Sequence, residues 1–288
     1  MVLLLPFYKG WEPLPSGMLV RKRDDVVGIR GDLALKTLAA AQEKGFQLTI
    51  VDGGSSAAFR EAVKDKLKLP LSDEKERGMS GGRRQSFRET SCLSGVKAIV
   101  WTEPEKVSIL QDCLSEAALP VLQGEADIVV PSRDDTAFST YPEYQANYEK
   151  DANRVWNGIL RRNGLLAEDA PDIDAWIGPR IIKNDPDILA PFLDKYEFEG
   201  RGESHYDKIN PELWPDALFL PLVASLYKGR RVQSVPVPYR HPAEQTASEQ
   251  DSPAFQAKRK EQFRTILVST THFIDYLNGR PKRLRPAA

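Results

Sequence analysis

Three short apolar runs, each ending abruptly in polar residues, most constrain what this chain can fold into. Residues 48–51, 98–101 and 127–130 are rich in Ile and Val, and helical stretches separate them. This arrangement is typical of parallel strands in an open α/β sheet. Because such sheets bind ligands outside the carboxyl ends of their strands, we expect one polar cleft there. The residues that follow the three runs would line it: Asp52-Gly53-Gly54, Glu103-Pro104-Glu105 and Pro131-Ser132-Arg133.

The overall charge is close to neutral, which argues against a broad surface for nucleic acid. Among 288 residues, 40 Lys and Arg stand against 41 Asp and Glu, a formal net charge of −1. Any binding of phosphate, from a nucleotide or a phosphorylated sugar, is therefore expected to be local. No apolar stretch approaches the roughly 18 residues of a membrane span. The two cysteines, Cys92 and Cys113, match no metal or redox spacing, and we expect a cytoplasmic protein with reduced thiols.

The order of elements predicts a single α/β domain. Strands are expected at 2–7, 47–51, 97–101 and 127–130, with helices between them, which favours a mostly parallel sheet. A proline-marked edge strand is expected at 231–239. Later helices are expected at 144–163, 214–229 and 255–277, and the stretch 179–192 is expected to contain another. The domain would cover 1–279, with a nucleotide-binding half at 1–130, an acceptor half at 131–279 and a disordered tail at 280–288.

Four short segments resemble a known family. They lie at 49–55 (TIVDGGS), 126–133 (ADIVVPSR), 172–180 (DIDAWIGPR) and 229–240, which ends in VPYR. Together they resemble GT-A-fold nucleotide-diphospho-sugar glycosyltransferases, in particular family-2 enzymes similar to dolichyl-phosphate-mannose synthase. The resemblance covers nearly the whole chain and implies a Rossmann-like GT-A fold. It also implies transfer of a sugar from a UDP- or GDP-linked donor to a hydroxyl of a soluble small-molecule or glycan acceptor.

One motif departs from the family pattern. Where the resemblance places a metal-binding D-x-D, the chain has Glu103-Pro104-Glu105. Two carboxylates at i and i+2 can still hold a divalent cation, because hard cations prefer oxygen ligands. The resemblance implies Mg²⁺ or Mn²⁺ on Glu103 and Glu105, and Glu103 would also contact the donor. In some members of the family a histidine in this late region completes the metal site, which makes His241 a candidate; the alternative is a histidine in a surface loop. The alternative is that the two acids are solvated loop residues ahead of a helix, where acids are favoured.

Four further residues are candidates for holding the donor nucleotide. The resemblance assigns the nucleotide base to Asp52 and Gly53, although Asp-Gly-Gly-Ser is also ordinary turn chemistry. Arg83 and Arg84 precede an expected helix, where free N–H groups and a guanidinium suit phosphate. The alternative for this pair is a flexible loop with solvated arginines.

The candidate catalytic bases are Asp174 and Asp216, because an inverting transfer must deprotonate the acceptor hydroxyl. Asp174 lies close to Trp176, whereas Asp216 could instead cap a helix. A retaining enzyme would need neither. Two other functions stay open: a catalytically silent sugar-nucleotide-binding protein, and a nucleotidyltransferase of the same fold. The second would carry a glycine-rich loop after the first strand, and the chain has Phe7-Tyr8-Lys9-Gly10-Trp11 there.

Overall fold

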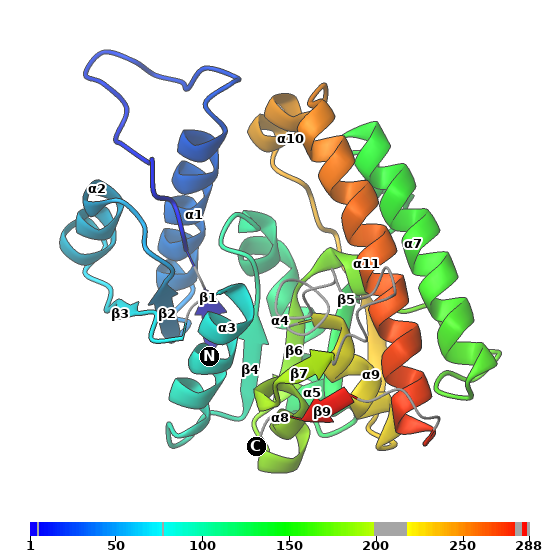
Figure 1. The fold of residues 1–288 in the computed structure, drawn as a ribbon. Helices are drawn as coiled ribbons and strands as arrows, with labels where there is room; N and C mark the ends of the chain where they lie inside the picture. Colours follow the sequence, from blue (N-terminus) through cyan, green and yellow to red (C-terminus); the bar gives the residue numbers. More distant parts are fainter. Residues whose placement is uncertain (5, 77, 199–217, 280–283, 287–288) are drawn as a thin grey trace.

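A seven-stranded sheet, in the order β3-β2-β1-β4-β6-β5-β8, forms the centre of the protein. The computed structural model describes residues 1–4, 6–76, 78–198, 218–279 and 284–286 (Figure 1). The strands of the sheet are β1 (Val2–Leu4), β2 (Leu48–Asp52), β3 (Ser72–Asp73), β4 (Ala98–Trp101), β5 (Ile128–Ser132), β6 (Arg180–Lys183) and β8 (Val232–Pro236). The pairs β1–β2, β1–β4, β2–β3 and β5–β8 are parallel, which confirms the expected mostly parallel α/β sheet.

Helices surround the sheet, and the two longest lie side by side at one end of it (Figure 1). The α-helices are α1 (Val26–Glu43), α2 (Ala57–Glu61), α3 (Met79–Ser91), α4 (Leu114–Ala117), α5 (Leu119–Leu122), α6 (Asp135–Phe138), α7 (Glu143–Arg162), α8 (Pro186–Leu193), α9 (Leu220–Tyr227), α10 (Ala243–Glu249) and α11 (Pro253–Leu277). Single turns η1 (Ala62–Lys66), η2 (Ile109–Cys113) and η3 (Ala175–Ile177) join some of them. Side chains fix the helix starts, since Asp25 accepts from the N–H of Gly28 and Ser252 from that of Phe255.

One element differs from the sequence-based expectation. The stretch 179–192 was expected to contain a helix, which α8 confirms, but its first residues form the strand β6, which was not predicted and runs antiparallel to both β4 and β5. The helix α8 begins only at Pro186, where Asp185 caps it. A short run such as Arg-Ile-Ile-Lys has no periodicity that separates a buried strand from a buried helix.

The sheet is covered on both faces. All four residues of β4 are buried, and so are Ile128, Val129 and Val130 in β5. Because neighbouring strand residues point to opposite faces, burial of consecutive residues requires layers on both sides. The buried apolar residues form one continuous cluster that extends from Val2 to Ile274, as in a single domain. The expected division at residue 130 falls inside β5.

The described residues leave out a segment with a candidate catalytic base and part of the C-terminal tail. Residues 199–217, which include His205, Trp214 and Asp216, lie outside the described residues. In the terminal segment that we expected to be disordered, β9 (Leu284–Pro286) pairs with β7 (Tyr196–Phe198). In the described residues, no helix is long and apolar enough to cross a membrane.

Candidate functional site

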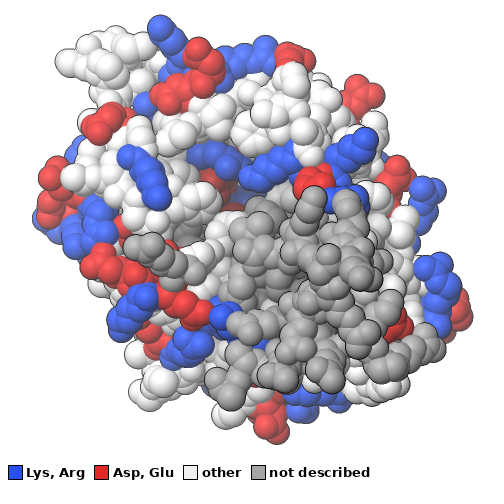
Figure 2. Space-filling model, viewed as in Figure 1, with Lys and Arg blue, Asp and Glu red and all other residues white. Residues whose placement is uncertain are grey.

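A polar cavity of about 80 Å³ lies at the carboxyl edge of the sheet. Glu103 and Glu105 reach it from the loop after β4, and Tyr239 and His241 reach it from the segment after β8. The η3 turn and α11 supply further walls, which include Trp176, Gly178, Arg259 and Gln262. The strands β4, β5 and β8 run in the same direction, so their carboxyl ends meet at this edge. In the space-filling view, acidic and basic side chains lie side by side around a hollow on the face of the molecule turned to the viewer (Figure 2).

Glu103 lies against the backbone of the η3 turn. Gly178 has φ +97°, and a Cβ there would come within 2.2 Å of a Glu103 carboxylate oxygen, so only glycine permits this approach. The neighbouring Arg180 is buried, which lowers its pKa to about 10, although the charges of Glu103 and Asp174 oppose this shift. Glu103 therefore faces a guanidinium that stays protonated at neutral pH.

Glu105 is tied to α1 and α10 through Arg30. The Arg30 Nε atom lies 3.7 Å from Glu105 Oε1 and 3.4 Å from Glu249 Oε1. Glu249 is fully buried, and Glu105 is 7% exposed. Taking these charges out of water is costly unless they are paired, so the three side chains hold one another in place.

Several buried polar atoms around the cavity have no hydrogen-bond partner among the described residues. They include Glu103 Oε2, Gln145 Oε1 and Gln262 Nε2. An unmade hydrogen bond on a buried group costs about 1–3 kcal/mol. The set contains donors as well as acceptors, and the rings of Trp176 and Phe219 lie beside it with centroids 4.7 Å apart. Such a wall suits a hydroxylated ligand, which can accept and donate hydrogen bonds and pack against an aromatic face.

His241 carries a neutral imidazole at the cavity. Burial, followed by the charges of Lys106 and Arg259, lowers the pKa of His241 well below its ordinary value. The ring packs against Tyr141, with centroids 4.2 Å apart, and its Nδ1 atom lies 2.7 Å from Thr246 Oγ1. A neutral imidazole keeps one nitrogen lone pair for a proton or a metal ion.

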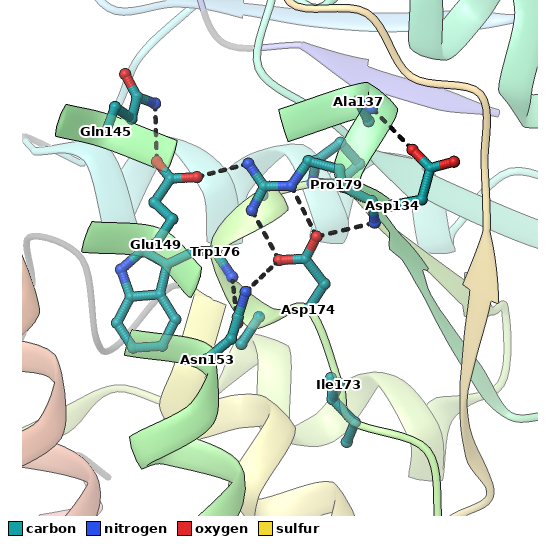
Figure 3. Close-up of polar contacts among 12 residues, drawn as sticks. Asp134, Ala137, Gln145, Glu149, Asn153, Ile173, Asp174, Trp176 and Pro179 are labelled. Carbon is teal, nitrogen blue, oxygen red and sulfur yellow. Dashed lines mark hydrogen bonds and ion pairs between the residues drawn. The ribbon is translucent and has the colours of Figure 1, made fainter. Parts of the chain in front are cut away.

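Asp174 is fully engaged by hydrogen bonds within the protein (Figure 3). Its carboxylate accepts from Arg133 Nε at 2.7 Å, Arg133 Nη2 at 2.7 Å and the Arg133 backbone N–H at 3.1 Å. It also accepts from Asn153 Nδ2 at 2.6 Å. Since a carboxylate offers about four acceptor positions, none remains for an acceptor hydroxyl. The geometry therefore favours a positioning role for Asp174 over the expected role of catalytic base.

The residues expected to hold the nucleotide lie at the same edge but not in the cavity wall. The buried Asp52 side chain accepts from the Ser55 N–H and pairs with Arg60 at 2.7 Å. Gly53 donates its N–H to Pro6 O at 2.8 Å, which holds the end of β2 beside the segment after β1. Asp52 and Gly53 thus shape a turn at the end of β2, two strands away from β4.

Arg83 and Arg84 lie inside a helix rather than in a loop. The helix α3 begins at Met79, so the expectation that Arg83 and Arg84 precede the helix is wrong. Arg83 lies with its guanidinium 4.3 Å from the Trp101 ring centroid, and Arg84 pairs with Glu76 at 2.6 Å. Both side chains are buried and neither is part of the cavity wall.

The residues of the cavity fit a cation that substrate phosphates help to bind. In the described part of the chain, no three acidic, His or Cys side chains come together closely enough to enclose an ion. Ions bridged by phosphates need only one or two carboxylates, because the substrate and water supply the other ligands. Glu103, whose Oε2 atom has no hydrogen-bond partner among the described residues, lines the cavity together with Glu105 and His241, and its carboxylate has the chemistry of such a ligand.

The sequence-based prediction missed the buried ionic network behind the cavity. Arg133 pairs with Glu149 at 2.5 Å as well as with Asp174, and Arg259 lies 3.8 Å from Glu149. Arg30 forms the second part of the network. Arg30, Glu149 and Arg259 all lie on helices, where charged residues ordinarily face solvent. Of these residues, only Arg133 could have been found from the sequence, because it ends the segment 126–133 that resembles the glycosyltransferase family.

The fold is the GT-A-like fold of nucleotide-diphospho-sugar transferases. Glucosyl-3-phosphoglycerate synthase from Mycobacterium tuberculosis, solved with phosphoglyceric acid, matches 98% of this chain and 80% of its own, with a TM-score of 0.50 and 10% identity.

Two other solved structures are similar over most of their length. A mannosyltransferase from Pyrobaculum calidifontis, solved with GDP-Man and Mn²⁺, is 12% identical over 96% of this chain and 74% of its own, with a TM-score of 0.46. HddC from Yersinia pseudotuberculosis, solved with GMP-PN, is 13% identical over 91% of this chain and 100% of its own, with a TM-score of 0.40. No protein-family model and no curated protein matches the sequence.

Proposed function

We propose that the protein transfers a glycosyl group from a nucleoside-diphosphate sugar to a hydroxyl of a small acceptor. One observation carries the proposal: two carboxylates, a neutral imidazole and unpaired polar side chains share one cavity at the carboxyl edge of the sheet. Nucleotide-binding α/β sheets place their ligands at this edge. Phosphates, a sugar ring and hydroxyl groups together require this mixture of partners.

Each part of the site has a role in such a transfer. Asp52 and Gly53 would hold the nucleotide base, and Trp176 would pack against the sugar ring. Glu103 or Glu105 would supply one or two carboxylates, with His241 nearby, to a divalent cation held mainly by the donor phosphates, and such a cation would stabilise the leaving diphosphate. Arg30 and Arg259 add fixed positive charge near the cavity, where negative charge develops on the leaving group.

The acceptor hydroxyl must lose its proton in an inverting transfer. Asp216 remains the proposed base, since Asp174 has its acceptor positions filled. The buried ion pair of Asp174 with Arg133 instead holds the η3 turn, and with it Trp176, at the cavity. Arg83 and Arg84 would act on the donor phosphates only through the position of α3.

Thermal unfolding against UDP, GDP, their common sugar conjugates and ATP, each with and without Mn²⁺, tests the proposal. A ligand at ~100 times its dissociation constant stabilises the folded state by about 2.7 kcal/mol. We expect one diphosphate nucleotide and its sugar conjugate to stabilise the protein, more strongly with Mn²⁺. If none of them shifts the transition, the proposed function is wrong.

Turnover separates transfer from the two alternatives. Release of the free nucleoside diphosphate from the stabilising sugar conjugate, with candidate acceptors present, supports glycosyl transfer. Binding without release under any of these conditions supports a silent binding protein. Formation of pyrophosphate from a nucleoside triphosphate and a sugar phosphate supports a nucleotidyltransferase.

A further inference from the structure

Three cations from three separate elements line the cavity. Arg30 belongs to α1, Lys106 to the loop between β4 and η2, and Arg259 to α11. Arg30 is matched by two buried glutamates at 3.7 and 3.4 Å. Among the described residues, Lys106 takes part in no ion pair, and Arg259 reaches only Glu149, at 3.8 Å. Lys106 and Arg259 thus differ from Arg30 in having no close carboxylate.

Glu149 leaves Arg259 available, because other groups already hold both of its carboxylate oxygens. Its Oε2 atom accepts from Arg133 Nη1 at 2.5 Å, and its Oε1 atom accepts from Gln145 Nε2 at 2.8 Å. The separation of 3.8 Å from Arg259 is too long for a hydrogen bond. Lys106 and Arg259 are therefore the cations of this wall that can pair with a charged ligand.

Two donors on α11 have no hydrogen-bond partner among the described residues. They are Arg259 Nε and Gln262 Nε2, and both atoms are buried. Gln262 is 7% exposed, and its Oε1 atom accepts from Arg259 Nη1 at 3.1 Å. This bond leaves the amide nitrogen of Gln262 as the end available to a ligand. A guanidinium with a free N–H beside such an amide suits the oxygens of a carboxylate or a phosphate.

The electrostatic field beside these donors is positive. Burial lowers the pKa of His241, and the charges that lower it further are all cations, with Lys106 and Arg259 first. Lys106 Nζ lies 5.2 Å from the centroid of the Tyr239 ring, which lines the same cavity. A field that disfavours a proton on His241 favours a negative group of a ligand at the same place.

The α11 wall lies far from the residues expected to hold the nucleotide. The helices α7 and α11 lie at the opposite end of the sheet from β2 and β3 (Figure 1). Four strands separate β2 from β8 in the sheet. A donor whose base is held at Asp52 and Gly53 would therefore leave this wall to the second substrate.

We propose that Lys106, Arg259 and Gln262 bind an oxyanion of the acceptor, a carboxylate or a phosphate, so that the acceptor is an acidic hydroxy compound. The oxyanion site follows from these side chains alone, whereas its place on the acceptor rests on the proposed function. The acceptor hydroxyls would meet the unpaired oxygens Glu103 Oε2 and Gln145 Oε1 in the same cavity. Arg259 would contact the acceptor directly and act on the leaving diphosphate only through its field.

Thermal unfolding with inorganic phosphate or lactate, in EDTA and at constant ionic strength set with chloride, tests the oxyanion site. We expect at least one of the two anions to raise the Tm more than chloride does. Arg259→Gln and Lys106→Gln should each raise the apparent dissociation constant at least about tenfold, because each removes a charge-assisted hydrogen bond. Lys260→Gln, the exposed neighbour on α11, removes the same charge and should behave as the wild type.

Three results overturn the oxyanion site. The first is a wild type that responds to neither anion. The second is a wild-type response in both Arg259→Gln and Lys106→Gln, and if one of these variants does not fold, the other decides. The third is an equal loss in Lys260→Gln, which would show that the anions only screen the surface charge.

The same titration in the presence of the nucleoside diphosphate that stabilises the protein separates the acceptor from the donor. If the oxyanion belongs to the acceptor, a saturating amount of the nucleotide should leave the dissociation constant of phosphate or lactate nearly unchanged. Competition between the two would assign the site to the donor diphosphate and overturn the place on the acceptor. If no nucleotide binds, the proposed function and the acceptor assignment both fail, while the first titration still decides the oxyanion site.

Discussion

Arg133 and Asp174 form a two-point ion pair inside the protein, with Nε–Oδ2 and Nη2–Oδ1 distances of 2.7 Å each. The Arg133 side chain is 0% exposed and that of Asp174 is 7% exposed. Arg133 directly follows β5, and Asp174 directly precedes the η3 turn. The pair therefore fixes the cavity wall that carries Trp176 to the carboxyl edge of the sheet.

Replacing Asp174 by Asn should strongly destabilise the protein. Removal of one partner from a buried ion pair leaves a buried charge and costs about 3–5 kcal/mol. Urea unfolding at pH 7 measures this loss in the free energy of unfolding. Asp172→Asn is the matched control, because Asp172 pairs with Arg161 at 2.7 Å but its side chain is 56% exposed. We expect the control to lose less than about 1 kcal/mol, and equal losses would contradict the importance of burial.

The same ion pair predicts a pH dependence of stability. Burial raises the pKa of Asp174, but the charge and hydrogen bonds of Arg133 outweigh it, so the pKa lies below its ordinary value. For a lowered carboxyl pKa, the contribution to stability is complete above the unfolded-state value of about 3.9 and is lost as the pH falls through the folded-state value. Unfolding free energies of the wild type and Asp174→Asn should differ at pH 7 and converge under acidic conditions. A constant difference down to pH 2 would argue against this account.

Gly178→Ala should disturb the Glu103 carboxylate. At φ +97° an alanine is strained, and its Cβ would lie 2.2 Å from Glu103 Oε1. We expect a loss of about 1–3 kcal/mol in unfolding free energy, and weaker Mn²⁺ binding because Glu103 must move. Gly158→Ala, inside α7 near its C-terminal end and with its nearest contact at 3.7 Å, should instead stabilise by about 0.5–1 kcal/mol. Equal effects of the two substitutions would remove Gly178 from the account of the site.

Glu103→Gln should remove the response to Mn²⁺ without unfolding the protein. The amide keeps the size of the side chain but replaces a charged oxygen ligand, which hard cations prefer. The measurement is the Mn²⁺-dependent part of the thermal shift with the stabilising nucleotide. Glu116→Gln, on the exposed face of α4, is the control and should behave as the wild type. A full Mn²⁺ response in Glu103→Gln would place the cation elsewhere.

Trp176→Ala should weaken binding of the sugar conjugate more than binding of the nucleoside diphosphate. Trp176 packs edge-on against Phe219 at 4.7 Å and forms a wall of the cavity. An aromatic contact of this kind contributes about 0.5–1.5 kcal/mol, so the dissociation constant of the sugar conjugate should rise up to about tenfold. Trp176→Phe should retain most of the affinity. Equal weakening for both ligands would place the sugar away from Trp176.

The sequence predicted the sheet better than the site. The strands β2, β4 and β5 are confirmed because β-branched runs between polar ends are a local signal. The sequence pattern predicts this helix only from Asp32, whereas α1 begins at Val26, because Gly28 and Gly31 lower helix propensity. In the structure Gly31 makes room for Trp11, since a Cβ there would meet its ring at 2.1 Å.

The site was harder to predict from the sequence, because the side chains that pair in it are far apart along the chain. Glu103, Glu105 and His241 were proposed from a resemblance, and the structure places them around one cavity. The pairing of Arg133 with Asp174 joins positions 41 residues apart, and no periodicity or motif encodes such a contact. Asp174 was identified as important, but its partner decides what it does.

The position of β6 between β4 and β5 has a consequence for how the chain can be divided. Residues 98–101 pair with 180–183, and residues 128–132 pair with 232–236, so each half of the chain completes the sheet of the other. A protein cut at residue 130 would leave the edge of β4 open, and open edges invite aggregation. During synthesis, β4 and β5 can be joined through β6 only after residue 183 has left the ribosome. The first half of the chain therefore cannot complete its sheet until part of the second half has been made.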